Sequence, residues 1–231
     1  MGRPPRNSQG GYVYHVVCRG LSSKPIFRND DDYVDMVSVL RESLDKFEPR
    51  LLSYCILPKH WHLVVTPRKD GDLSRLVAWL TITHAARWHS KPRRANTGGI
   101  YVRRFKSFPV QDDLALLDVL QFVESHPKRV GLVERSQDWR WSSAAARLQS
   151  GNPADAIPIA SPPIPVPSDW VDCIDRAIAP EILESLKTCI LRSRPYGETA
   201  WVERTAKRLG IETTLRPRGR PRKTETESPG K

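Results

Sequence analysis

Short apolar runs alternate with stretches of helical periodicity along the first half of the chain. Tyr and Val dominate residues 12–18, and a second apolar run covers 51–57, so both segments predict strands. Between them, apolar residues recur every three or four positions as far as Phe47, and Asn29 or Asp30 can cap this helix. The pattern therefore predicts strand, helix, strand as the opening order.

The same periodicities predict three more elements before residue 130. A helix covers about 73–88, with His84 and His89 among the polar residues of its outer face. Residues 100–110 then suit a strand or a hairpin, and a third helix follows until His126-Pro127 ends it. These short, interspersed elements predict an α+β fold, a ferredoxin-like antiparallel sheet with helices packed on it, expected on one face.

The composition of the chain changes after about residue 150. The next stretch is rich in proline, at Pro153, Pro158, Pro162, Pro163, Pro165 and Pro167. Such a stretch is typical of a linker. Helical patterns then return around 170–179, 180–192 and 198–209. We therefore expect a domain over 1–150, a Pro-rich linker over 151–168, and a helical extension with a basic, disordered tail over 169–231.

A His-x-His sequence interrupts the apolar run of residues 54–65. In a strand, His60 and His62 point to one face, while Trp61 and its alternate neighbours point to the other. Two imidazoles on one face can hold a metal ion, and they can equally be structural histidines with hydrogen-bond partners. Pro58 leaves open whether this region is one kinked strand or two.

The charge of the chain points to a polyanionic partner. The net charge is +11 and the pI is about 9.8, which favours nucleic acid, although an acidic membrane surface would also fit. The basic residues gather in two blocks, 68–110 and 192–231, and 145–190 is acidic. In the first block, Arg103, Arg104 and Lys106 surround an aromatic ring. This cluster suits phosphate contact with base stacking, or else a solvated basic edge strand.

The second basic block contains the sequence Arg-Gly-Arg-Pro. Arg218 and Arg220 belong to this short match to an AT-hook, whose arginines lie in a narrow minor groove. A disordered tail with nonspecific affinity for phosphate explains the same residues.

Other features of the chain predict a cytoplasmic protein without a membrane partner. The four cysteines form no C-x-x-C pair, which disfavours a zinc knuckle. The first residues lack the apolar core of a signal peptide, and no apolar run has membrane-spanning length.

Five stretches of the chain, taken together, resemble the REP-associated tyrosine transposases, which belong to the single-tyrosine HUH transposases. They are YHVVCRG at 14–20, YCILPKHWH at 54–62, RFKSF at 104–108, FVESHP at 122–127 and DWRWSS at 138–143. The resemblance implies a ferredoxin-like nuclease that acts on single-stranded or hairpin DNA. It also implies that the two histidines and a polar helix residue bind a divalent metal (Mg, Mn or Zn), while a tyrosine on that helix attacks phosphorus.

The chain departs from this family at the helix. Phe122 stands at the position of the nucleophilic tyrosine, and it has no oxygen with which to attack. His126 takes the place of the family's asparagine, so His60, His62 and His126 become the expected metal ligands, a set that favours Zn, Mn or Co over Mg. The nearest tyrosines to these stretches are Tyr54 and Tyr101, neither of which is on the helix.

These features predict a transposase-like protein of DNA transposition, or a domesticated derivative, that binds single-stranded or hairpin DNA. Arg19, Arg103, Arg104, Lys106, Arg218 and Arg220 are the expected DNA contacts. Phe122 argues that transesterification is lost, and the three histidines leave open a metal-dependent nuclease in which water attacks. The alternative is a non-catalytic regulator that binds DNA through its basic patches and tail. A monomer and a homodimer both remain open.

Overall fold

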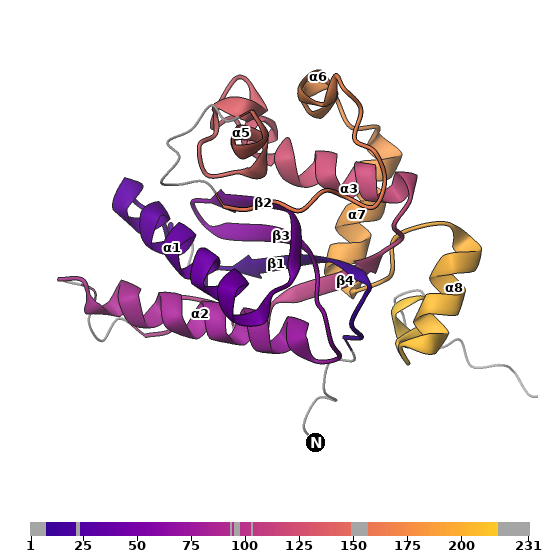
Figure 1. Ribbon diagram of the computed structural model, residues 1–231, viewed down its shortest axis with the longest axis horizontal. Helices are drawn as coiled ribbons and strands as arrows, with labels where there is room; N and C mark the ends of the chain where they lie inside the picture. Colours follow the sequence, from indigo (N-terminus) through magenta and orange to yellow (C-terminus); the bar gives the residue numbers. More distant parts are fainter. Residues whose placement is uncertain are drawn as a thin grey trace, which may run out of the picture.

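The computed structural model describes residues 8–21, 24–92, 94, 98–102, 104–148 and 157–216. Four antiparallel strands form its sheet in the order β2-β3-β1-β4 (Figure 1). The strands are β1 (Val13–Arg19), β2 (Arg50–Leu57), β3 (His60–Thr66) and β4 (Lys106–Val110). Helix α1 (Asp30–Phe47) connects β1 to β2, and α2 (Asp72–Ser90) connects β3 to β4. The predicted ferredoxin-like α+β fold is confirmed.

The histidine-bearing strand is the second arm of a hairpin. β2 ends at Leu57, the two residues Pro58 and Lys59 make the turn, and β3 begins at His60. Proline lacks the N–H that a strand ladder needs, which explains why the chain turns there. The region is therefore two strands, and β3 lies in the middle of the sheet between β2 and β1.

Helices cover both faces of the sheet, not one. On one face Trp61, Leu63 and Val65 of β3 join the core under α1 and α2. On the other face Val64 packs with residues of α3 (Leu114–Glu124) and α7 (Pro180–Arg192). Figure 1 shows α1 and α2 on the side of the sheet away from α3 and α7. The side-chain alternation expected for β3 is confirmed, and it places His62 on the α3 side.

His84 lies in the core, contrary to the outer-face position that helical periodicity predicted. Its side chain is 1% exposed, and its Nδ1 lies 2.9 Å from the hydroxyl of Tyr101. The loop that carries Tyr101 folds over this side of α2, and the sequence pattern of the helix alone contains no sign of that cover.

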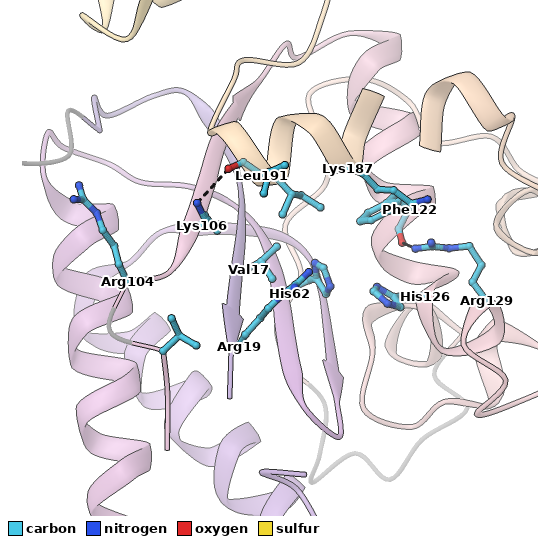
Figure 2. Close-up of a pocket in the computed structure, with 12 residues that line it drawn as sticks. Val17, Arg19, His62, Arg104, Lys106, Phe122, His126, Arg129, Lys187 and Leu191 are labelled. Atoms are coloured by element: carbon cyan, nitrogen blue, oxygen red, sulfur yellow. Dashed lines mark hydrogen bonds between the residues drawn. The ribbon is translucent and has the colours of Figure 1, made fainter. Parts of the chain in front are cut away.

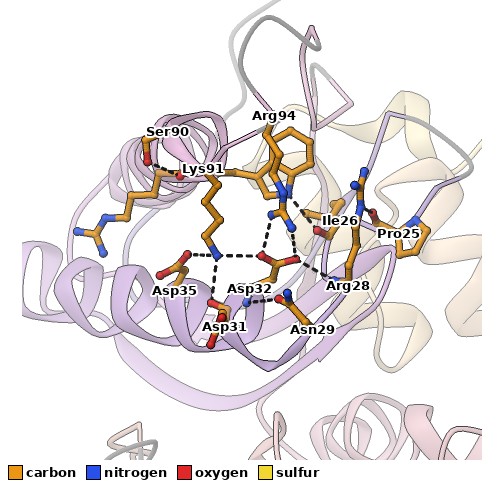
Figure 3. Close-up of polar contacts among 12 residues, drawn as sticks. Pro25, Ile26, Arg28, Asn29, Asp31, Asp32, Asp35, Ser90, Lys91 and Arg94 are labelled. Carbon is orange, nitrogen blue, oxygen red and sulfur yellow. Dashed lines mark hydrogen bonds and ion pairs between the residues drawn. The ribbon is translucent and has the colours of Figure 1, made fainter.

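A buried carboxylate joins the start of α1 to the end of α2 (Figure 3). Asp32 is 1% exposed and forms ion pairs with Arg94 at 2.7 Å and with Lys91 at 2.9 Å. Burial by itself would raise the pKa of Asp32, but the hydrogen bonds from Arg94 and Lys91 outweigh it and lower the pKa to about 2. The charged form is therefore held in the fold, and it fastens the chain that follows α2 against α1.

The part of the chain after α3 consists of short helices. They are α4 (His126–Arg129), the 3-10 turn Ser136–Asp138, α5 (Ser143–Arg147), α6 (Trp170–Asp175), α7, α8 (Thr199–Arg208) and the 3-10 turn Glu212–Thr214. The predicted helix at 170–179 ends at Asp175, and a loop leads to Pro180, the first residue of α7. Within the described residues, no helix is long and apolar enough to cross a membrane.

The proline-rich stretch packs against the sheet. Residues 157–168 contain neither helix nor strand, in keeping with their prolines. The N–H of Ala160 donates to the carbonyl of Leu51 at 2.7 Å, and Arg50 donates to the carbonyl of Ser161 at 2.8 Å. This part of the predicted linker therefore runs along the outer edge of β2. Arg103, Arg218 and Arg220 lie outside the described residues.

Candidate functional site

Three imidazoles meet on the α3 side of the sheet. His60 and His62 project from β3 on the same face because side chains alternate along a strand. His126 follows α3 directly, since Ser125 keeps a helical backbone (φ −80°, ψ −5°) and carries the chain into α4. One ring nitrogen from each histidine lies within 4.8 Å of the other two, an arrangement that could hold one metal ion.

The protonation of these rings suits metal binding. Burial lowers the pKa of His60 to about 4, with a smaller effect of Arg19, and it lowers the pKa of His62 well below 6.5. The pKa of His126 falls to about 2 through burial and the neighbouring cationic groups. All three rings are therefore neutral at neutral pH and offer lone pairs, as ligand histidines must.

Two ring nitrogens of the cluster are buried without a hydrogen bond. Nε2 of His62 and Nδ1 of His126 have no partner among the described residues. A buried polar atom without a partner is costly, and structural histidines normally satisfy theirs. The residues present thus fit a divalent metal better than they fit a purely structural role.

A fourth histidine stands behind the cluster. His15, on β1, is fully buried, and its Nε2 lies 2.9 Å from Nδ1 of His62. The two rings are stacked with centroids 5.1 Å apart. The sequence pattern indicated no role for His15, although strand alternation puts it on the same face as Val17, the residue paired with His62.

Phe122 lies beside the imidazoles, at the position where the family resemblance expects a tyrosine. Its ring centroid is 6.0 Å from that of His62 and 5.8 Å from that of His126 (Figure 2). The guanidinium of Arg129 lies over the ring, 4.3 Å from its centroid, and donates to the backbone carbonyl of Phe122. The helix therefore presents an apolar ring to the three imidazoles.

No tyrosine stands in for Phe122. The chain has six tyrosines, all within the described residues, and none lines the pocket around the histidines. Tyr54 and Tyr101 pack in the core on the α1 and α2 side of the sheet. The hydroxyl of Tyr101 lies within hydrogen-bond distance of Trp61 and His84, on the face of the sheet opposite the three imidazoles.

The pocket around His62, Phe122 and His126 has a volume of about 470 Å³ and a basic wall. Its cationic lining residues are Arg19, Arg104, Lys106, Arg129 and Lys187 (Figure 2). The first three are DNA contacts expected from the sequence, and they line the same pocket as His62 and His126, although Figure 2 shows the side chain of Arg104 extending away from the imidazoles. Arg129 was not among the expected contacts, although its helical spacing from Phe122 and His126 could have predicted that it lies near them.

The place of Lys187 in the pocket could not be predicted from the sequence, because it depends on tertiary packing. Lys187 belongs to α7, beyond the proline-rich stretch, and no local pattern links that helix to β4. In the structure, Lys106 Nζ of β4 donates to the carbonyl of Leu191 at 3.2 Å, next to the pocket. The extension after residue 169 therefore supplies one wall of the site.

A buried carboxylate braces the helix that carries Phe122. Glu124 is fully buried and accepts hydrogen bonds from Ser143 at 2.7 Å, Arg147 at 3.0 Å and Trp170 at 2.7 Å. These partners come from α5 and α6, so the carboxylate ties three helices together. The network fixes α3, and with it Phe122 and His126, against the sheet.

Comparisons with known proteins agree with this geometry. A family model described as "Transposase IS200 like" matches residues 8–126. A Haemophilus influenzae protein named "Putative REP-associated tyrosine transposase" is 27% identical over 121 residues, which are 48% of this chain and 69% of that protein. A solved structure of a REP-associated tyrosine transposase bound to a REP hairpin matches with a TM-score of 0.55 at 14% identity. The match covers 73% of this chain and all of that one, and it supports the fold alone.

Proposed function

The chain belongs to the IS200-like transposase family, and from this membership we propose that it binds single-stranded or hairpin DNA at the histidine pocket without forming a covalent link to it. The observation that carries the proposal is Phe122, which lies beside three neutral imidazoles where the family resemblance expects a tyrosine. Such a site keeps its means of binding a phosphate and lacks the hydroxyl that would attack it.

The basic wall supports DNA as the partner. Arg19, Lys106 and Lys187 approach the pocket from β1, β4 and α7, so a strand crossing it would meet cations on several sides. Phosphate contacts of this kind supply most of the affinity for nucleic acid and position the strand without reading its sequence. A REP hairpin is the ligand of the REP-associated transposase whose fold is similar, and we propose a hairpin for this chain.

The metal site would be formed by His60, His62 and His126. A divalent ion bound there would act as a Lewis acid on the phosphate. Three imidazoles without a carboxylate favour Zn, Mn or Co over Mg. The protein's own part is to hold three neutral rings toward one point and to neutralise the DNA backbone with the surrounding cations.

A second candidate function is hydrolysis of the strand by water. It is favoured by the unpartnered ring nitrogens of His62 and His126, since a protein that only binds DNA has no need of a metal site. In that case the DNA is cut but never joined to the protein. Labelled hairpin DNA mixed with the natural protein and Mn²⁺ or Zn²⁺ separates the two functions when cleaved fragments are measured, because one predicts no product and the other predicts free fragments.

Phe122→Tyr is the variant that tests the proposal. We expect it to form a protein–DNA adduct that survives denaturation when it is mixed with labelled hairpin DNA and Mn²⁺ or Zn²⁺, because it restores a hydroxyl beside the metal ligands. The natural protein and Phe122→Leu should bind the hairpin and form no adduct. An adduct with the natural protein would overturn the proposal, since another residue would then be the nucleophile.

A further inference from the structure

We propose that His15 is a positioning residue for the metal site: it holds the ring of His62 so that Nε2 of His62 presents its lone pair to the other two imidazoles. The inference rests on the proposed function, because it concerns how the chain prepares those ligands. It starts from one contact, the 2.9 Å approach of His15 Nε2 to His62 Nδ1 between β1 and β3.

This contact determines which nitrogen of His62 is available. A neutral imidazole carries one proton, so a hydrogen bond between two such rings needs one donor and one acceptor. If His62 donates from Nδ1, its Nε2 is a lone pair that can bind a metal. If His15 donates instead, the proton of His62 must sit on Nε2, where it blocks the ligand position. Metal binding therefore requires Nε2 of His15 to be the acceptor.

The other described neighbours of His15 give its polar ring no second hydrogen-bonding role. The ring is fully buried between Phe108, at 4.9 Å, and Phe122, at 6.0 Å. Among the described residues, its Nδ1 has no hydrogen-bond partner, and its Nε2 contacts Nδ1 of His62. A residue selected for packing alone at this place would be apolar, as Val13 and Val17 on the same face of β1 are.

His15 also restricts the ring of His62 geometrically. The two rings are stacked at an angle of 19°, so rotation of His62 away from the cluster would break both the stacking and the hydrogen bond. Partners behind a metal ligand commonly set its tautomer and orientation, and their loss typically lowers metal affinity about 10–100-fold. We expect a loss in that range when the acceptor is removed from His15.

The test compares His15→Leu with His15→Gln in the full chain, prepared without metal. Titration with Zn²⁺ by calorimetry, and with Co²⁺ by its visible absorption, should show affinity lowered about 10–100-fold in His15→Leu. In His15→Gln the amide oxygen can take the acceptor position, so its affinity should stay within about threefold of the natural protein's. The metal-free melting temperature of His15→Leu should stay close to that of the natural protein, because leucine removes the unpaired Nδ1 of His15 and leaves Nδ1 of His62 unpaired in its place.

A second measurement needs no substitution. The ¹⁵N shifts of the side-chain nitrogens in the metal-free natural protein should show the proton of His62 on Nδ1 and that of His15 on Nδ1. Finding the proton of His62 on Nε2 would overturn the inference, and so would metal affinity equal to the natural protein's in a folded His15→Leu. If the natural protein binds neither Zn²⁺ nor Co²⁺, the metal site of the proposed function fails, a result distinct from either of these.

Discussion

Phe122 differs from the tyrosine expected at its position by a single hydroxyl group. Its ring already lies 5.8 Å from His126 and 6.0 Å from His62, and the helix under it is held by the Glu124 network. The change therefore removes the attacking atom and leaves the surrounding geometry in place. This is why a single substitution, Phe122→Tyr, is a fair test of whether the rest of the site remains competent.

His126 stands where the family resemblance expects an asparagine, and in the proposed site it would set the metal preference. His126→Asn exchanges an imidazole nitrogen for an amide oxygen, a harder ligand that suits Mg²⁺ and Mn²⁺ better than Zn²⁺. We expect Zn²⁺ affinity to fall by about tenfold or more, measured by calorimetry on metal-free protein. His89→Asn, on α2, is the matched control. Unchanged Zn²⁺ affinity in His126→Asn would show that His126 is not a ligand.

At the scale of elements, the placement of the site depends on how strands and helices are joined. β3 presents His60 and His62 from the middle of the sheet, and the step from α3 to α4 brings His126 over them. On each face of the sheet, one helix is fastened by a buried charge. Glu124 binds α3 to α5 and α6, and Asp32 binds the start of α1 to the chain after α2.

Asp32 should make stability depend on pH in the acid range. Its pKa is about 2 in the fold against an ordinary 3.8, so its contribution of about 2 kcal/mol is present above about pH 4 and is lost as the pH falls toward 2. Urea denaturation of the natural protein and Asp32→Asn should therefore show a stability difference that shrinks by about this amount between about pH 5 and pH 2. A difference that does not vary with pH would contradict the assignment.

At the scale of the whole molecule, the basic charge is directed toward one pocket by segments far apart in sequence. Arg19 comes from β1, Lys106 from β4, Arg129 from α4 and Lys187 from α7. A net charge of +11 alone would predict attraction to any polyanion, whereas this arrangement predicts a defined path for a strand past the histidines.

The salt dependence of hairpin binding measures this arrangement. Lys106→Gln should lower the slope of log K against log salt concentration by about one unit, because one phosphate contact is lost. Arg75→Gln, on α2 and outside the pocket, removes the same charge and should leave the slope nearly unchanged. Equal effects of the two variants, measured by fluorescence anisotropy over a range of salt, would show that binding is not centred on the pocket.

The sequence by itself determined the parts of this protein that depend on local pattern. Alternation in β3 placed His60 and His62 on one face, and the capping signal at Asn29 or Asp30 placed the start of α1 to within one residue. Helical spacing put Phe122 and His126 one turn apart. The cluster of cations around an aromatic ring identified Arg104 and Lys106 as expected DNA contacts. These features depend on the spacing of residues that are close in the sequence, so they can be predicted without the tertiary structure.

Only the tertiary structure decided the features that depend on contacts between distant segments. The pairing of β1 with β3 brings His15 to His62, 47 residues away, and no local pattern encodes which strands become neighbours. The same is true of the loop with Tyr101 that buries His84, and of the packing of residues 157–168 along β2. It is also true of α7, which brings Lys187 to the pocket. Periodicity indicates which face of an element packs on the core, whereas long-range packing determines what that face contacts and, as at His84, whether a residue outside it is buried as well.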